Sequence, residues 1–466
     1  MSRSVDGAAS GAGPTAAEWQ RLFRDHVREM EVVCERALEY SAAAGEGFDG
    51  VVFHAGSPVF YHRDDQLMPF RTSAHFARWG AIPGANHLLA QVPGRRARLV
   101  RVVPDDYWYG APPPGPFDEL LDDIYDVSEV PSLEAAAGEI TALGAMAYIG
   151  NAADFASGAG FPERGLDPGA LVASLDWDRA IKTDYEIECI RAAARRAGLG
   201  HAAVRILAED GASERQLHAA YLEASVQLES ETPYPNIIAW NEASAVLHYE
   251  ERRPETPAEA RCLLIDAGAS VHGYASDISR TYALRDAPSV FVELLEGMER
   301  LQADLVESVR PGSYVAVHEQ AARGACELLR EAGVLRIEAE EALEGGFDRC
   351  FFPHGVGHHL GLQVHDVGGV QHSPAGETVE PPVGSPALRT TRPLAERHVV
   401  TIEPGLYFIP LLLAPLRGSA AGKQVDWSLV DELTPCGGIR VEDDVVVTAE
   451  GCENLSRPFV PGATGA

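Results

Sequence analysis

Two aspartates on one predicted hairpin place the strongest constraint on how this chain can fold. In "CLLIDAGASVHGYASDISRTY" (residues 262–282) an apolar run ends at Asp266, a glycine-containing turn follows, and Asp277 lies on the return strand. If the turn centres near Val271 and His272, the two carboxylates stand directly opposite each other. Opposed like charges destabilise a sheet by up to about 1 kcal/mol, and by more when buried. A cation between them would remove the repulsion; alternatively, one of the two is only a turn residue.

Two glutamates raise the same difficulty further along the chain. Glu403 lies within "HVVTIEPGLYF" and Glu442 within "GGIRVEDDVVVT", both among β-branched and apolar residues. A buried ionised carboxylate without a partner is costly, so each needs a proton, a cation or a metal. Arg440 precedes Glu442 by two residues and shares its face on a strand. This arginine could orient the carboxylate beside a metal, or simply neutralise it.

A histidine-rich segment accompanies these carboxylates. "FFPHGVGHHLGLQVHDVGG" (351–369) contains His354, His358, His359 and His365, four of the 16 histidines of the chain. They could hold a metal, hold a substrate, or merely be tolerated in a glycine-rich loop. Carboxylates with one imidazole suit Mn²⁺, and Co²⁺, Fe²⁺ or Zn²⁺ are also possible. Because four carboxylates balance two divalent cations, a two-metal site with ions about 3.5–4 Å apart, sharing an activated water, is favoured.

Composition excludes several other classes of protein. The net charge of −31 argues against nucleic-acid and anionic-membrane partners. Seven scattered cysteines without a C-x-x-C pair argue against disulfides and a thiolate zinc site. The N-terminus has no apolar signal region and no segment approaches about 18 apolar residues, so we expect a soluble, cytoplasmic protein. Lys182 and Lys423 are the only lysines, for which a GC-rich genome is the simplest cause.

The pattern along the chain predicts two α/β domains. We expect a disordered tail over 1–18, a smaller N-terminal α/β domain over 19–172 and a larger domain over 173–466. A segment rich in Gly and Pro, 160–170, reads as the linker. Helices with capping boxes begin after Thr183 (with Glu186) and after Ser213 (with Gln216), and a helical pair covers about 288–333.

The ordered motifs D-x(10)-D, H-G-x-G-H-x-x-G-x-x-x-H-D, T-I-E-P-G and R-x-E resemble those of the pita-bread metallopeptidases, which include methionine aminopeptidase, aminopeptidase P and prolidase. Over about 20–458 the chain is most similar to bacterial Xaa-Pro dipeptidases (prolidases), including those called organophosphorus acid anhydrolases. The resemblance implies a pita-bread catalytic domain behind a smaller α/β domain. It also implies two divalent metal ions, held by Asp266, Asp277, His358, Glu403 and Glu442.

The resemblance further assigns roles at the substrate. Glu403 would pass a proton from the activated water towards the leaving nitrogen, and His248 would stabilise the carbonyl oxygen. His365 and His354 would act beside the substrate, whereas His359 matches no role. Arg389, in "PALRTTR", would bind the free C-terminal carboxylate, although it could instead be a surface arginine. The substrate-binding set is Arg389, Arg440, Tyr234, Tyr314, Val364, Asp65 and Trp108, with Asp65 and Trp108 reaching an active site, in a dimer that of the partner subunit.

The expected function is therefore hydrolysis of Xaa-Pro dipeptides by a homodimer. Aminopeptidase P activity on longer peptides is the first alternative, and a non-catalytic peptide-binding module is the second. Incidental hydrolysis of organophosphate triesters is a further possibility, because an activated water can also attack phosphorus. Ser279 departs from the usual Thr of the family, and the longer interval over 411–430 favours the dipeptidase branch.

Overall fold

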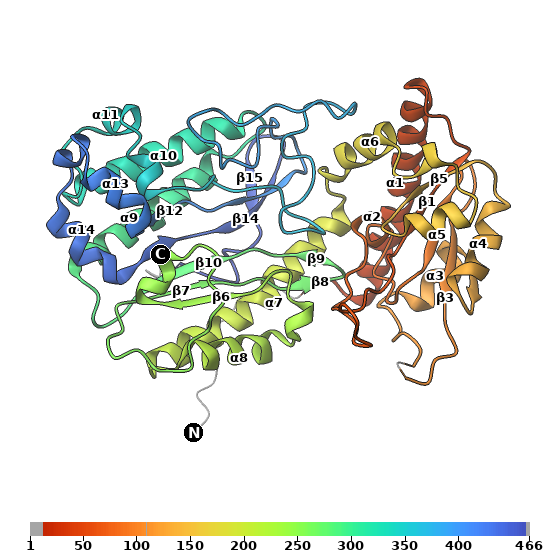
Figure 1. The fold of residues 1–466 in the computed structure, drawn as a ribbon, viewed down its shortest axis with the longest axis horizontal. Helices are drawn as coiled ribbons and strands as arrows, with labels where there is room; N and C mark the ends of the chain where they lie inside the picture. The colour runs from red at the N-terminus through yellow and green to blue at the C-terminus, as the bar shows by residue number, and fades with distance from the viewer. Residues whose placement is uncertain (1–12, 109, 463–466) are drawn as a thin grey trace.

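The chain forms two lobes that lie side by side (Figure 1). The structure is a computed structural model that describes residues 13–108 and 110–462. Most of the predicted tail, residues 1–12, lies outside the described residues. Helix α1 begins at Ala16, where Thr15 and Glu18 form a capping box, so the predicted tail extended three residues too far.

The N-terminal lobe is a five-stranded mixed sheet with helices packed around it. The strand order is β4-β3-β2-β1-β5, with β1–β5 and β3–β4 parallel and the other pairs antiparallel. Its elements are α1 (Ala16–Ala43), β1 (Gly50–His54), α2 (Ala74–Ala77), β2 (Leu88–Gln91), β3 (Arg98–Val102), η1 (Asp118–Leu120), α3 (Leu121–Ile124), β4 (Asp126–Val130), α4 (Leu133–Thr141), β5 (Met146–Ile149), α5 (Ala153–Gly158), η2 (Glu163–Gly165) and α6 (Gly169–Arg179).

The C-terminal lobe consists of short antiparallel sheets flanked by two pairs of longer helices. The sheets are β10-β7-β6, β11-β14-β15, β12-β13 and β8-β9. The helices are α7 (Asp184–Glu209), α8 (Glu214–Ser225), η3 (Glu229–Glu231), η4 (Asn241–Ala245), α9 (Ser289–Ser308), α10 (Tyr314–Glu331), α11 (Ala339–Glu344), α12 (Asp348–Phe351), α13 (Pro410–Arg417), η5 (Ala421–Gln424), α14 (Trp427–Leu433) and η6 (Thr434–Cys436). The strands are β6 (Ile237–Trp240), β7 (Cys262–Asp266), β8 (Ser270–Val271), β9 (Tyr274–Ala275), β10 (Ser279–Ala283), β11 (Val399–Ile402), β12 (Gly405–Tyr407), β13 (Gly438–Arg440), β14 (Asp443–Val447) and β15 (Cys452–Asn454).

Local sequence signals account for these elements. The capping boxes predicted at Thr183 and Ser213 are present and begin α7 and α8. The predicted helical pair is α9 and α10, each with one buried face. Strands β6, β7 and β11 are buried along their whole length, as expected for mainly apolar runs covered on both sides. Strand β14 is also fully buried, although it begins with Asp443 and Asp444.

The chain passes from one lobe to the other between α6 and α7. The expected boundary at 172/173 falls inside α6, which packs against α1. The segment 160–170 is not the connection, because Leu166 forms a β-bridge with Tyr148 within the first lobe. Beyond α6, the amide of Lys182 donates to the carbonyl of Arg397 in the second lobe at 2.9 Å. Within the described part of the chain we find no helix with the length and apolarity of a membrane span.

Candidate dimetal active site

Asp266 and Asp277 share one face of a hairpin but are not directly opposite. The structure pairs Asp266 with Ser279, and the turn is occupied by His272 and Gly273, with φ of 51° and 89°. Two-residue hairpin turns favour residues that adopt positive φ, as His272 and Gly273 do here. The turn is therefore centred one residue later than the predicted Val271 and His272. Asp277 therefore becomes a diagonal neighbour of Asp266, just ahead of β10. The even spacing still directs both carboxylates to one face.

The two glutamates lie at strand ends rather than inside strands. Glu403 follows β11 and its amide donates to the carbonyl of Val356 at 2.8 Å. Glu442 separates β13 from β14, and its amide donates to the carbonyl of Ser279 at 3.1 Å. The hydroxyl of Ser279 donates to Oε2 of Glu442 at 2.7 Å. Because both glutamates lie just outside the strands, their side chains can point to a common site between the sheets.

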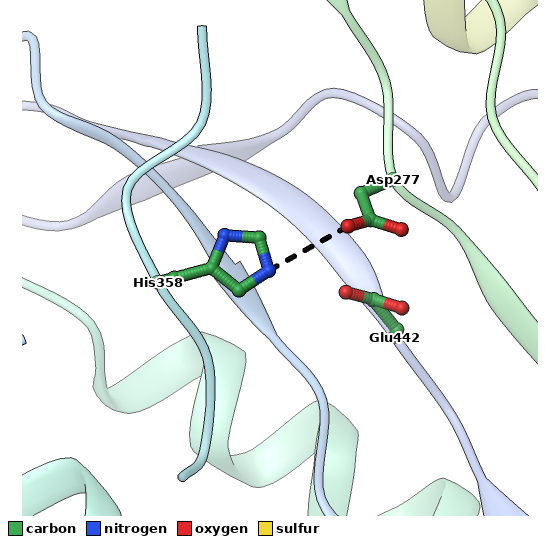
Figure 2. A group of neighbouring side chains, drawn as sticks. All are labelled: Asp277, His358 and Glu442. Carbon is green, nitrogen blue, oxygen red and sulfur yellow. Dashed lines mark ion pairs between the residues drawn. The ribbon is translucent and has the colours of Figure 1, made fainter. Parts of the chain in front are cut away.

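His358 completes the cluster from the histidine-rich segment. Its Nδ1 lies 3.0 Å from the carbonyl of His359, which leaves Nε2 directed at the carboxylates. This Nε2 is 3.5 Å from Asp277 and 3.6 Å from Glu403. Ligand atoms of Asp277, His358 and Glu442 all lie within 4.8 Å of one another (Figure 2).

A buried chain of hydrogen bonds supports the cluster from behind. Nη2 of Arg440 lies 2.6 Å from Oδ2 of Asp266, and Nε donates to Ser279 at 2.9 Å. Nη1 of Arg440 donates to the hydroxyl of Tyr407 at 2.9 Å, and this hydroxyl lies 2.8 Å from Nε2 of His354. Tyr407 was absent from the predicted site, although it stands four residues after Glu403 in "IEPGLYF".

The cluster is short of positive charge. Burial raises the pKa of Glu442 well above its ordinary value, and repulsion from Asp277 and Glu403 adds to this. Burial also raises the pKa of Glu403 to about 7, although the positive charge of His358 opposes the shift. Among the described residues, Oε1 of Glu442 is buried without a hydrogen-bond partner. An oxygen-rich cluster with one imidazole and an unpartnered carboxylate oxygen fits divalent cations.

A cavity of about 1000 Å³ opens from this cluster. The histidine ring of His365 contacts that of His358 edge to face, with centroids 4.4 Å apart. Arg71 reaches the cavity from the N-terminal lobe and donates to the carbonyls of Thr232 and Pro233, both at 2.7 Å. The predicted site residues that line the cavity are Tyr234, His248, Asp266, Asp277, His354, His358, Val364, His365, Arg389, Glu403, Arg440 and Glu442.

Three predicted substrate residues lie elsewhere in the chain. Tyr314 is buried at the start of α10, where its hydroxyl donates to the carbonyl of Thr401 at 2.7 Å; it stands behind the cavity wall, so its predicted lining role is wrong. Asp65 is exposed and Trp108 is 77% exposed, both on the N-terminal lobe and outside the cavity of their own chain. His359, for which no role was expected, is buried against His398.

The fold and the carboxylate–imidazole cluster define the class of a metal-dependent hydrolase. The profile of metallopeptidase family M24 matches residues 188–449, and the profile described as "Xaa-Pro dipeptidase, N-terminal domain" matches residues 21–177. The chain belongs to metallopeptidase family M24, and the predicted pita-bread fold behind a smaller α/β domain is confirmed.

Similar proteins cover nearly the whole chain. The Xaa-Pro dipeptidase of Shewanella amazonensis is 40% identical over 442 residues, covering 94% of this chain and 98% of the relative. That of Actinobacillus pleuropneumoniae is 36% identical over 440 residues, with 94% and 97% covered. Aminopeptidase P from E. coli with the inhibitor Pro-Leu superimposes with a TM-score of 0.70 at 21% identity, covering 97% of each chain, which shows the shared fold.

Proposed function

We propose that this chain is a dimetal dipeptidase that cleaves Xaa-Pro dipeptides. The observation that carries the proposal is one cavity that brings Arg389 and His365 together with the carboxylate cluster. Relatives of nearly equal length named Xaa-Pro dipeptidase support it. The match of residues 21–177 to the profile of the Xaa-Pro dipeptidase N-terminal domain supports it too. We propose that the catalytic domain starts near residue 180, after the end of α6.

The five predicted ligands Asp266, Asp277, His358, Glu403 and Glu442 would hold two divalent ions. Their oxygen-rich donor set favours Mn²⁺, while Co²⁺, Fe²⁺ and Zn²⁺ also accept such ligands. When bound, the ions would supply the positive charge that activates a water and polarises the scissile carbonyl.

The protein side chains would manage the protons and the orientation of the peptide. Glu403, partly exposed to the cavity, would accept a proton at its carboxylate and deliver it to the leaving proline nitrogen. His365 and His248 would donate to the carbonyl oxygen as negative charge develops there. His354 and Arg440, joined through Tyr407, would keep the carboxylates oriented.

Arg389 would decide between a dipeptidase and an aminopeptidase. It is exposed at the cavity wall. Its positive charge adds to the effects of burial and of His358 that lower the pKa of His365. A guanidinium there can bind the C-terminal carboxylate of a dipeptide in a two-point contact, which a longer peptide does not offer. Aminopeptidase P activity remains the alternative, in which the cavity accepts chain beyond proline.

A homodimer would use an exposed aromatic patch on the N-terminal lobe. Four aromatic side chains on two segments of this lobe are exposed, and we include them in the proposed patch: Phe60 (53% exposed), Tyr61 (44%), Tyr107 (86%) and Trp108 (77%). Exposed apolar side chains that gather into one patch are typical of interaction surfaces. Asp65 and Trp108 lie on the same two segments, so dimerisation through them would bring both residues to the partner's cavity.

Location and side activity are further parts of the proposal. All seven cysteines are free, which suits the reducing cytoplasm. Hydrolysis of organophosphate triesters would be incidental, by attack of the same activated water on phosphorus.

The test is a comparison of Ala-Pro, Ala-Pro-Ala and Ala-Ala as substrates. Cleavage of Ala-Pro alone is expected. Cleavage of the tripeptide at a similar rate would assign aminopeptidase P activity instead. A protein that binds metal but cleaves none of the three would favour a non-catalytic peptide-binding module, unless triesters are turned over.

A further inference from the structure

Lys182, one of only two lysines in the chain, is completely buried between α6 and α7. Its ammonium donates to the carbonyl of Arg179 at 2.8 Å, to the carbonyl of Ala180 at 3.4 Å and to Oδ2 of Asp366 at 3.1 Å. An ammonium has three donors, and all three are used. The planar fork of arginine, which serves nearly everywhere else in this chain, cannot satisfy three acceptors arranged around one point.

Asp366 receives a second cation from the end of α6. Its Oδ1 accepts from Nε of Arg179 at 3.2 Å and from Nη2 at 2.5 Å. The side chains of Arg179, Lys182 and Asp366 are exposed by 3%, 0% and 0%. These three residues, called the linker clamp below, therefore fasten the segment between the lobes to the residue that follows His365.

The loop of the histidine-rich segment is shaped to close over the linker clamp. A Cβ added at Gly361 would lie 2.2 Å from Oδ2 of Asp366 and 2.8 Å from Cε of Lys182, so only glycine fits. The carbonyl of Gly361 accepts from the amide of Ala275 at 2.9 Å, and the amide of Asp366 donates to the carbonyl of His359, also at 2.9 Å. The loop is thus held on both sides.

His365 is an exposed member of this loop, as Gln363 is. It precedes Asp366 directly, lines the cavity and packs edge to face on the ring of His358. Across residues 13–108 and 110–462 we find no hydrogen bond or ion pair from its ring, and its ring contact is the one with His358, so its position depends on the backbone of Asp366. Displacement of a group that contacts the substrate by about 1 Å can lower a rate by up to about a hundredfold.

We propose that the linker clamp is a positioning device that holds His365 over the metal cluster. Lys182 and Arg179 act through Asp366 and do not touch the substrate. The effect on catalysis rests on the proposed function, in which His365 contacts the scissile amide. A purely structural ion cluster joining the two lobes is the competing explanation.

The experiment is a double-mutant cycle between Lys182→Met and His365→Ala, with Ala-Pro as substrate. Lys423→Met is the control, because Lys423 is the other lysine and is exposed. We expect Lys182→Met to lower kcat/KM by about tenfold or more with bound metal unchanged, and to cause no further loss in the His365→Ala background. Independent, multiplicative losses, or an unchanged kcat/KM in folded Lys182→Met, would overturn the proposal.

Hydrogen exchange over residues 359–369 gives a readout that needs no activity. In Lys182→Met, but not in Lys423→Met, the amide of Asp366 should exchange at least about tenfold faster while β7 and β10 stay protected. Unchanged protection would overturn the positioning role even if the chain cleaves no dipeptide. If Lys182→Met does not fold, Arg179→Lys takes its place. It keeps the charge but loses the fork of Nε and Nη2 that holds Oδ1 of Asp366, so the same two results are expected at smaller size.

Discussion

The hydroxyl of Ser279 donates a hydrogen bond of 2.7 Å to Oε2 of Glu442. Ser279 is the residue that pairs with Asp266 across the hairpin. Ser279 stands where the resembling family usually has threonine, and either residue can make this bond. The other oxygen, Oε1 of Glu442, is buried and has no hydrogen-bond partner among the described residues.

Ser279→Ala should therefore weaken metal binding. Loss of the bond frees Glu442 to rotate, and such supporting residues typically change metal affinity by about 10- to 100-fold. Titration of metal-free protein with Mn²⁺ measures the change. Ser279→Thr is the matched control and should bind as the wild type does; equal affinity in the alanine variant would show that Glu442 needs no such support.

Arg389→Ala should raise the KM for Ala-Pro by about 10- to 100-fold, because hydrogen bonds to a charged partner contribute about 1.5–3 kcal/mol. The metal content should not change, since Arg389 is exposed and, among the described residues, forms no ion pair with the five ligand residues. Arg285→Ala is the control, because Arg285 is an exposed arginine just beyond the end of β10. A normal KM in Arg389→Ala would remove the basis for dipeptide selection.

Glu186→Gln should destabilise the junction of the two lobes. Glu186 is fully buried, pairs with Arg78 of the N-terminal lobe at 3.2 Å and accepts from the hydroxyl of Tyr274 at 2.9 Å. Breaking a buried ion pair by removing one charge costs about 3–5 kcal/mol. Glu188→Gln is the control, because its i,i+3 pair with Arg191 lies nearer the surface and should contribute less than about 1 kcal/mol.

The same pair predicts a pH dependence of stability. Burial opposes ionisation of Glu186, but Arg78 and His26 outweigh it and hold its pKa at about 2, below the ordinary 4.5. A lowered pKa in the folded state stabilises the protein above pH 4.5, and this stabilisation is lost as the pH falls from 4.5 towards 2. Thermal unfolding between pH 6 and pH 2 should show a smaller drop in Glu186→Gln than in the wild type; parallel curves would contradict this.

Trp108→Ala combined with Phe60→Ser should weaken the proposed dimer without unfolding the chain, because both side chains are exposed. Sedimentation velocity at several concentrations measures the dissociation constant. A wild-type protein that stays monomeric at every concentration would dismiss the aromatic patch as a dimer interface.

The sequence predicted the structure best where residues stand in a context that has a clear physical cost or a local hydrogen-bonding role. Carboxylates among apolar residues pointed to the cluster, and capping boxes located α7 and α8, because both signals are local. The hairpin register was off because it depends on which residues adopt positive φ, here His272 and Gly273. One shifted turn moved Ser279, rather than Asp277, opposite Asp266.

Long-range packing was out of reach of the same reasoning. Tyr407 reads as an ordinary strand residue, and only the fold brings its hydroxyl to Arg440 and His354. Tyr314 was placed at the cavity by resemblance, yet it is buried behind Thr401. Lys182 looked like a consequence of composition until three acceptors were found around its ammonium.

The most direct test of the central claim is stepwise return of Mn²⁺ to chelator-stripped protein, with bound metal and Ala-Pro cleavage measured on the same samples. We predict no cleavage in the stripped protein and activity that rises until about two ions are bound per chain. Asp277→Asn, which changes one of the five predicted ligands, should abolish the response. Full Ala-Pro cleavage by the metal-free protein, or no metal binding at all, would contradict the account.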